Sequence, residues 1–205
     1  MTVRLPRRTK AEQTAATTDR LIATARKMFA ERGYARTATE DIVAAAEVTR
    51  GALYHHFPGK DALFGAVFLQ LQAEIGDRIE AASAKYDDSW SQIVEGCRAF
   101  LEAACETDFR QIVLRDGPAV IGPEAWRKAD ERHATFRLRR ALAELNEVTG
   151  STAVDVEPMT ALLNGALNEA ALWIAEATDH DAALARADAA FAQLIAVLKP
   201  QIASG

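Results

Sequence analysis

A run of polar and small side chains near residue 50 has the composition of a surface that reads DNA. Arg50 can donate two parallel hydrogen bonds to guanine, and Thr49 can contact a base edge or a thymine methyl group. Gly51 and Ala52 are small enough to let the backbone approach the floor of a major groove. We expect DNA contacts from Thr37, Thr39, Thr49, Arg50, Gly51, Ala52, Tyr54, His55 and Lys60.

Two short helices must hold this surface. Thr37 is a suitable N-cap, and Glu40 follows three residues later, where a capping box requires it. The chain is expected to turn at Glu47, and Thr49 then caps a second helix over residues 50–57. Two short helices joined by a tight turn, with the second one exposed and polar, predict a helix-turn-helix.

The remaining polar residues of the set fit phosphate contacts. Tyr54, His55 and Lys60 would lie beside the backbone of the DNA. Lys60 also begins the next expected helix, whose free N–H groups favour an anion. The alternative interpretation is that residues 54–57 form an aromatic patch that packs a small helical bundle.

These positions carry a known signature. The stretch closely resembles the helix-turn-helix of the tetracycline-repressor (TetR) family of transcriptional regulators. That family usually places Gly in the turn, where this chain has Glu47. We therefore expect Glu47 to adopt a left-handed conformation at a cost of about 1 kcal/mol. The matching residues are Thr39, Glu40, Asp41, Ile42, Ala46, Val48, Gly51, Leu53, Tyr54, His56, Phe57 and Lys60.

The resemblance implies a function and an organisation. It implies a DNA-binding regulator, a repressor in the first instance, that dimerises through its last two helices on a palindromic operator. A small hydrophobic effector would bind the body and release the DNA, and no cofactor is implied. A ligand-independent or activating regulator is the alternative. We expect a basic arm over residues 1–16, a DNA-binding domain over residues 17–60, and an effector-binding and dimerisation domain over residues 61–205.

Composition agrees with an all-α fold class. Apolar residues make up 49% of the 205 residues, while Gly and Pro number only 11 and 6. We find no apolar run of membrane-spanning length, and the N-terminus is basic and polar, so we expect a cytoplasmic protein without a membrane span.

The net charge of −5 is unevenly distributed. Residues 1–60 contain 11 Lys and Arg against 6 Asp and Glu, which gives +5. Residues 61–205 contain 13 against 23, which gives −10. The basic part of the chain is thus the part that contains the expected DNA-binding residues.

Apolar periodicity predicts about nine helices in all. The expected helix from residue 60 to residue 84 would link the DNA-binding unit to the body. The other helices are expected over residues 17–32, 87–104, 108–117, 122–148, 158–177, and from Asp179 or Asp181 to Pro200.

The two cysteines, Cys97 and Cys105, lie on one expected helix, about 12 Å apart along its axis. That separation is too large for a disulfide, so we interpret them as buried thiols rather than a redox pair.

Some residues of the body could line an effector pocket. Asn164 and Asn168 share a helix face inside an apolar run, and a buried amide needs a hydrogen-bond partner. An effector could supply it, as could the dimer mate, and each candidate could equally be a plain core residue. The candidates are Trp90, Phe100, Cys105, Trp126, His133, Phe136, Asn164, Asn168 and Trp173.

An enzyme is the main rival class. A di-metal carboxylate bundle needs Glu three residues before His on two helices. None of the four histidines, His55, His56, His133 and His180, has a Glu at that position. Phosphate-binding loops, nucleophile elbows and Cys/His metal spacings are also missing from the sequence. We therefore expect neither catalytic nor metal-binding residues.

Overall fold

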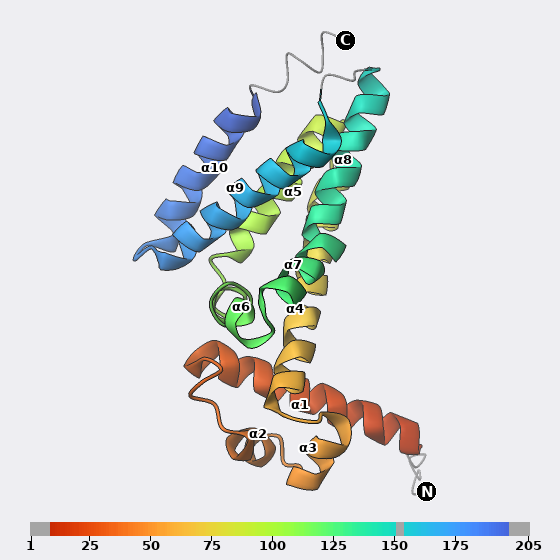
Figure 1. Cartoon of the computed structure of the whole chain (residues 1–205), viewed down its shortest axis with the longest axis vertical. Coiled ribbons are helices and arrows are strands. Elements are labelled where there is room, and N and C mark those ends of the chain that lie inside the picture. Colours follow the sequence, from red (N-terminus) through yellow and green to blue (C-terminus); the bar gives the residue numbers. More distant parts are fainter. Residues whose placement is uncertain (1–8, 151–153, 197–205) are drawn as a thin grey trace, which may run out of the picture. The chain divides into compact units, whose positions relative to one another are not determined.

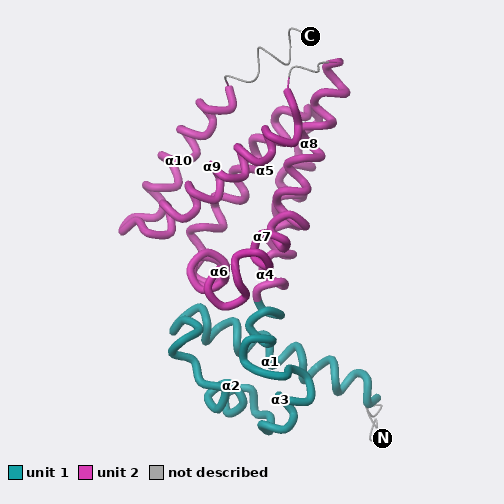
Figure 2. The backbone as a smooth tube through the Cα atoms, in the orientation of Figure 1, with its two compact units in different colours: residues 1–67 teal, residues 68–205 magenta. Residues whose placement is uncertain are grey.

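The computed structural model describes residues 9–150 and 154–196. Within these residues the chain forms ten α-helices and one π-helical segment, and no β-strand (Figure 1). The predicted all-α class is therefore confirmed, whereas the expected number of about nine helices is slightly too low. The residues divide into two compact units, one ending at Val67 and the other beginning at Phe68 (Figure 2).

Unit 1 contains three helices and the beginning of a fourth. These are α1 (Lys10–Arg32), α2 (Thr39–Ala45), α3 (Arg50–His56) and the first turns of α4 (Lys60–Ser83). Its core is aromatic, because the rings of Phe29 and Phe64 pack edge to face at 5.2 Å and both contact the ring of Tyr34. The division between the units lies inside α4, beyond the boundary that the sequence suggested at residue 60.

Helix α1 begins earlier than predicted. It was expected from Thr17, but it begins at Lys10, so the last part of the expected basic arm is helical. The reason is local: Thr9 and Glu12 form a reciprocal capping box, with Thr9 Oγ1 accepting from the Glu12 amide at 3.2 Å. Residues 1–8 of the expected arm lie outside the described residues.

The turn between α2 and α3 has the predicted strained conformation. Glu47 has φ 53°, and among the described residues it is the one non-glycine with positive φ, so that expectation is confirmed. Thr49 caps α3 as predicted, since its Oγ1 accepts from the Ala52 amide at 3.1 Å. The expected cap at Thr37 is wrong: Ala38 precedes α2 and supplies no side-chain cap.

Unit 2 is a helical bundle around α5 (Ser89–Ala103). Helix α5 packs against α8, α9 and α10, and these helices run alongside one another in Figure 1. Asp88 caps α5, within the residues expected to do so. The other elements are η1 (Phe109–Asp116), α6 (Gly117–Val120), α7 (Pro123–Arg132), α8 (Ala134–Thr149), α9 (Val156–Glu176) and α10 (His180–Ala196).

The helix expected over residues 122–148 is broken in two. His133, with φ −117° and ψ −84°, separates α7 from α8, although no Gly or Pro marks the place. A buried carboxylate lies at the break: Asp130 accepts a hydrogen bond from the Thr135 hydroxyl just beyond it, at 3.0 Å. Helix α10 begins beside Asp179, which caps it, and its expected end at Pro200 lies outside the described residues.

Candidate functional site

Helix α3 presents a polar face to solvent. Leu53 is fully buried, and Phe57, which follows the helix, is almost so; both therefore fix α3 to the core of unit 1. On the other faces, Thr49, Arg50, Gly51, Tyr54 and His55 are exposed, and Ala52 is half-buried. A Cβ added to Gly51 would have one neighbour within 4 Å, Thr49 Oγ1 at 3.9 Å, so the surface here is open.

Arg50 is held by two neighbours. Its Nη1 lies 3.1 Å from Glu40 Oε1 of α2, and its guanidinium carbon lies 5.5 Å from the centre of the Tyr54 ring. A hydrogen bond and charge interaction with Tyr54, followed by the charge of Glu40, raise the pKa of Arg50. The guanidinium therefore has partners on both α2 and α3, and no sequence pattern predicted its contact with Glu40.

Thr37 does not belong to this surface. Its side chain is only 1% exposed, and its hydroxyl donates to the Gly33 carbonyl at 2.8 Å. The expectation of a DNA contact from this side chain is therefore wrong. The hydroxyl instead satisfies a carbonyl at the end of α1, whose last carbonyls have no intrahelical partner. Thr39, the first residue of α2, is half-buried.

Lys60 has a structural role that the sequence did not indicate. Its Nζ donates to the carbonyl oxygens of Tyr34 and Thr37, each at 3.0 Å, and lies 4.0 Å from the centre of the Tyr34 ring. Tyr34 also donates its hydroxyl proton to Asp61. These contacts fasten the loop between α1 and α2 to the start of α4, so two of the three ammonium donors of Lys60 already have partners.

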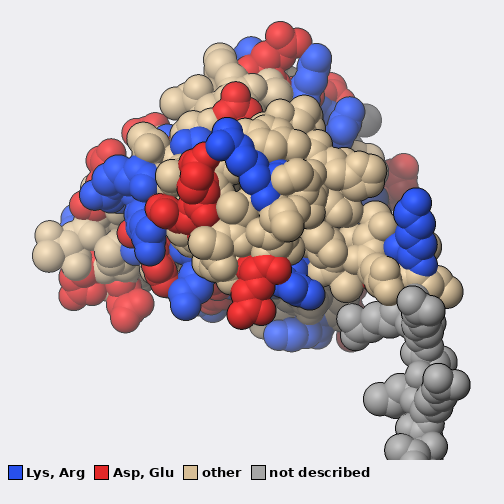
Figure 3. Space-filling view, turned by 90° about the horizontal axis from the view of Figure 1, so that it is seen from below, with Lys and Arg blue, Asp and Glu red and all other residues tan. Residues whose placement is uncertain are grey.

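Charges on unit 1 are interleaved rather than gathered. Arg32 lies 3.5 Å from Asp41, and Arg50 lies beside Glu40. The space-filling view likewise shows basic and acidic side chains next to one another around a broad uncharged surface (Figure 3). On the side that Figure 3 shows, the described basic side chains therefore form no continuous basic face.

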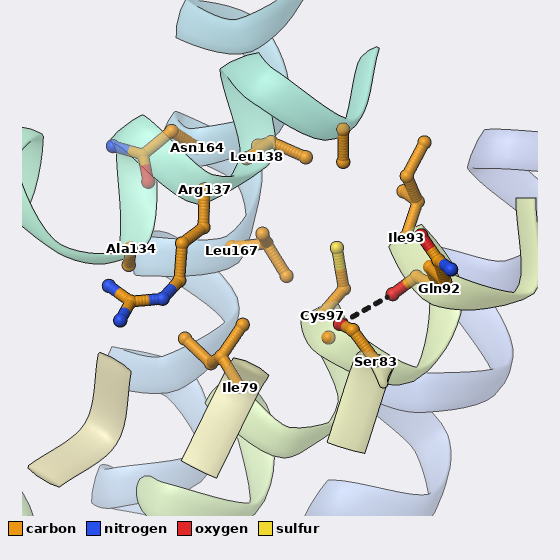
Figure 4. Close-up of a pocket in the computed structure, with 12 residues that line it drawn as sticks. Ile79, Ser83, Gln92, Ile93, Cys97, Ala134, Arg137, Leu138, Asn164 and Leu167 are labelled. Atoms are coloured by element: carbon orange, nitrogen blue, oxygen red, sulfur yellow. Dashed lines mark hydrogen bonds between the residues drawn. The ribbon is translucent and has the colours of Figure 1, made fainter. Parts of the chain in front are cut away.

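Unit 2 contains a small, largely apolar cavity of about 50 Å³ between α4, α5, α8 and α9 (Figure 4). Of the predicted pocket residues, Asn164 lines it. Most of the lining residues were not predicted from the sequence, because they are ordinary core residues. The walls consist of Ile79, Ser83, Gln92, Ile93, Gly96, Cys97, Ala134, Arg137, Leu138, Ala141, Asn164 and Leu167.

Asn164 and Asn168 find their partner inside the chain. Both donate their amide N–H to Asp130 Oδ2, at 2.8 and 3.4 Å, and the Thr135 hydroxyl donates to the same oxygen. Asp130 is only 4% exposed. This cluster joins α7, α8 and α9. It gives both amides the hydrogen-bond acceptor that the sequence predicted they need, without an effector or a dimer mate.

The other predicted pocket residues are dispersed. Phe100 packs edge to face on Phe109 in the core. Trp126 donates its indole N–H to the Val113 carbonyl at 2.9 Å, and with Asn168 it lines a separate pocket of about 360 Å³. Phe136 and Trp173 are exposed, so the expectation that they line an enclosed cavity is wrong. Trp90 is half-buried on α5.

The titratable candidates are not poised for chemistry. Burial raises the pKa of the Cys97 thiol to about 12, and burial also raises the pKa of the half-buried Cys105. Burial, followed by the charge of Arg137, lowers the pKa of His133. Both thiols are free, as predicted, and Cys97 is buried whereas Cys105 is only partly so.

Helices α9 and α10 expose large apolar side chains. A groove of about 510 Å³ runs between them, with Trp173, Phe191 and Leu194 in its wall, and Arg186 lies over the Trp173 ring at 5.0 Å. Leu162 and Leu172 on α9 are exposed as well. In the residues that the structure covers, no helix is long and apolar enough to cross a bilayer.

Two family models match this sequence. The model of bacterial regulatory proteins of the tetR family matches residues 21–67, which contain α2 and α3. The model of the tetracyclin repressor-like C-terminal domain matches residues 90–198, which include most of unit 2. The two matches thus follow the division of the chain into units.

Individual relatives agree with the family models. A solved TetR-family transcriptional regulator from Pectobacterium atrosepticum is 41% identical, with a TM-score of 0.77 over 92% of this chain and 96% of that one. The Transposon Tn10 TetC protein of Escherichia coli is 26% identical over 145 residues, 71% of this chain and 73% of the relative. The HTH-type transcriptional regulator CymR of Pseudomonas putida is 40% identical over 97 residues, 46% of this chain and 48% of the relative.

Proposed function

This chain belongs to the TetR family of DNA-binding transcriptional regulators, which are not enzymes, and we propose that it is a dimeric repressor that a small hydrophobic effector releases from a palindromic operator. The observation that carries the proposal is the exposed polar face of α3, a helix that the buried side chain of Leu53 anchors to the core of unit 1. In this reading α2, the turn and α3 form the helix-turn-helix, and α3 is its recognition helix.

Base reading is assigned to the N-terminal end of α3. Arg50 is exposed there, and its guanidinium fork matches the two acceptors of guanine. The open surface at Gly51 would allow α3 to lie close to the groove floor. Thr39, Thr49, Ala52, Tyr54 and His55 complete the proposed contact set. Lys60 adds positive charge near the phosphates and at the same time fastens the α1–α2 loop.

Dimerisation is assigned to α9 and α10. Their exposed apolar residues and the groove beside Trp173 form a surface that a second copy of the chain would cover. A two-fold axis through this surface would present two α3 helices to DNA. Half-sites about 34–36 Å apart would then be read together.

Effector release is assigned to unit 2. An effector must bind the state that cannot hold DNA more tightly than the other state, by about ten thousandfold for a nearly complete switch. The cavity of about 50 Å³ between α4, α5, α8 and α9 is far smaller than the roughly 300–1,000 Å³ of typical ligand pockets. An effector that binds there must enlarge the cavity or extend into the adjoining groove of about 330 Å³. A ligand-independent or activating regulator is the alternative.

Fluorescence anisotropy tests DNA recognition. The purified protein is titrated into labelled duplex DNA from upstream of its own gene and into a scrambled duplex, at one fixed salt concentration. The proposal expects tighter binding to the upstream duplex with two protomers per site. If that duplex shows no preference, a selection from random DNA identifies the operator, and failure to enrich any sequence contradicts the proposal.

Arg50→Ala tests the assignment of the reading face. We expect sequence preference at one base position to relax, with a loss of about 1–3 kcal/mol on the operator. Arg78→Ala is the matched control, because Arg78 also forms an exposed ion pair, with Glu106, but lies in unit 2. Unchanged sequence preference in Arg50→Ala would mean that another surface reads the bases.

A further inference from the structure

We propose that the cavity of unit 2 takes a small apolar carboxylate, and that Arg137 of α8 binds its anionic end. The inference rests on the proposed effector function and names the chemical class of the effector. It starts from two adjoining, partly open spaces, the cavity of about 50 Å³ and a groove of about 330 Å³. The two share five wall residues, Ile79, Ser83, Gln92, Arg137 and Ala141.

The two spaces meet at these shared side chains. The groove runs between α4 and α8, and its charged lining also includes Glu80 and the ion pair of Arg140 with Glu144, whose Nε and Oε1 lie 3.2 Å apart. Its volume alone reaches the lower end of the roughly 300–1,000 Å³ range of ligand pockets. Rotation of the shared side chains would therefore merge the apolar cavity with a groove of sufficient size.

Arg137 is the cation in the wall of both spaces. Its Nε lies 3.1 Å from Glu80 Oε2, its Nη2 lies 3.7 Å from Asp77 Oδ1, and its Nη1 donates to the His133 carbonyl at 3.3 Å. The Arg137 side chain is only 20% exposed, whereas those of Glu80 and Asp77 are 53% and 83% exposed. The cation is thus nearly buried while its acidic partners are solvated.

This asymmetry makes the acidic partners replaceable. An exposed carboxylate returns to water at little cost, so the ion pairs of Glu80 and Asp77 contribute little net stability. A carboxylate that enters the groove could take their place on the guanidinium and form two parallel hydrogen bonds, the geometry that Arg favours. The positive charge would then remain compensated throughout.

The remaining walls of the cavity favour a ligand that is apolar apart from its anionic end. Ile79, Ile93, Leu138 and Leu167 form most of its wall. In Figure 4 the side chains of Arg137 and Asn164 lie toward one side of the space, and Cys97, Ser83 and Ile93 lie toward the other. The polar groups Ser83 and Asn164 already have partners, the Gln92 carbonyl and Asp130. An apolar molecule with one anionic end matches this distribution.

Gly76 of α4, which has no side chain, leaves room for the guanidinium of Arg137. A Cβ added there would lie 2.7 Å from Arg137 Nη1, so the guanidinium rests directly on the helix where any other residue would push it aside. Because the clashing atoms are the far end of a flexible side chain, Gly76→Ala should displace the guanidinium and leave the fold intact. This variant therefore moves the proposed binding group without removing it.

Benzoate and benzyl alcohol are the probes, since they differ in charge but hardly in size. Binding to the full-length protein is measured by calorimetry and by the shift in melting temperature, with no DNA present. We expect benzoate to bind the wild type roughly tenfold more tightly than benzyl alcohol, a difference of about 1.4 kcal/mol. Arg137→Gln and Gly76→Ala should both remove this preference and leave the binding of benzyl alcohol unchanged.

Arg139→Gln is the matched control. Arg139 lies on the same helix and forms an exposed pair with Glu157, but it lines neither space. This variant should keep the preference for benzoate. Equal binding of the two probes to the wild type, no binding of benzoate at millimolar concentration, or a preference that survives in Arg137→Gln would each overturn the proposal.

The outcome is separable from that of the proposed function. If benzoate binds through Arg137 but does not release operator DNA, the ligand assignment stands and the proposed release fails. If sequence-specific DNA binding is found and benzoate does not bind, the repressor stands and the carboxylate site is rejected.

Discussion

Glu47 adopts a backbone conformation that is unfavourable for any residue with a side chain. Its φ of 53° is in the left-handed region, where glycine has no Cβ penalty. We expect Glu47→Gly to raise the free energy of unfolding by about 1 kcal/mol. Urea denaturation followed by circular dichroism measures this change.

Glu47→Ala separates conformation from charge. Alanine removes the carboxylate but keeps a Cβ at positive φ, so this variant should not reproduce the gain in stability. If alanine stabilises as much as glycine, repulsion of the Glu47 charge is the cause and the strain argument is wrong. Tighter DNA binding by both variants would point to the same charge effect.

Some features of unit 1 could be predicted from the sequence and others could not. Thr49 and Glu47 behave as predicted, because capping and left-handed turns depend on immediate neighbours. The burial of Thr37 was not predicted, although its hydroxyl bonds to Gly33 only four residues away. The intramolecular contacts of Lys60 were not predicted because they come from tertiary packing. The Lys60 ammonium is held by carbonyls 23 and 26 residues away, a contact that no local pattern encodes.

The junction of α7, α8 and α9 depends on one buried carboxylate. Asp130→Ala would leave the amides of Asn164 and Asn168 and the Thr135 hydroxyl without their acceptor. We expect a loss of about 2 kcal/mol in the free energy of unfolding, since unpaired buried donors are costly. Thermal and urea denaturation measure it, with Glu131→Ala, an exposed neighbour on the same helix, as the control.

A near-neutral result for Glu131→Ala is expected, because exposed substitutions usually stay within about 0.5 kcal/mol. Equal losses in the two variants would show that helix α7 as a whole, rather than the Asp130 cluster, is the sensitive feature.

Helix ends differed in how well the sequence predicted them. The starts of α3 and α5 were predicted well because Thr49 and Asp88 follow local capping rules, and the start of α4 because it directly follows Pro58 and Gly59. The break at His133 was missed because no Gly or Pro marks it; the Asp130 cluster that lies beside it has its other members on α8 and α9. The cavity was missed for a similar reason: its walls are ordinary apolar residues that four helices bring together.

For the whole molecule, the first question is assembly. Leu194 of α10 is 52% exposed in the proposed dimer surface, while Leu69 of α4 is 50% exposed outside it. We expect Leu194→Arg to convert the dimer to a monomer, because burying an unpaired charge in an apolar interface is costly. Light scattering coupled to size-exclusion chromatography measures the mass of each variant.

Leu69→Arg is the control for that experiment and should remain dimeric, since it changes the same side chain at the same exposure. A dimer that survives Leu194→Arg but not Leu69→Arg would move the interface from α10 to α4.

Stability of the whole fold should depend on the protonation of His133. Burial lowers its pKa in the folded state, so below an unfolded value of about 6.5 the unfolded chain binds a proton more readily. The contribution of His133 is therefore fully present above that pH and is lost as the pH falls through it. Urea midpoints at neutral and mildly acidic pH, compared with those of His133→Gln, test this, and an equal loss in both proteins would contradict it.

The exposed indole of Trp173 can report on its surroundings through its intrinsic fluorescence. It lies in the groove between α9 and α10, under the guanidinium of Arg186. An indole in contact with water emits at longer wavelength than one in an apolar environment. Closure of that groove by any partner would thus shift the emission of Trp173 to shorter wavelength. The double variant Trp90→Phe, Trp126→Phe would leave Trp173 as the one tryptophan of the chain.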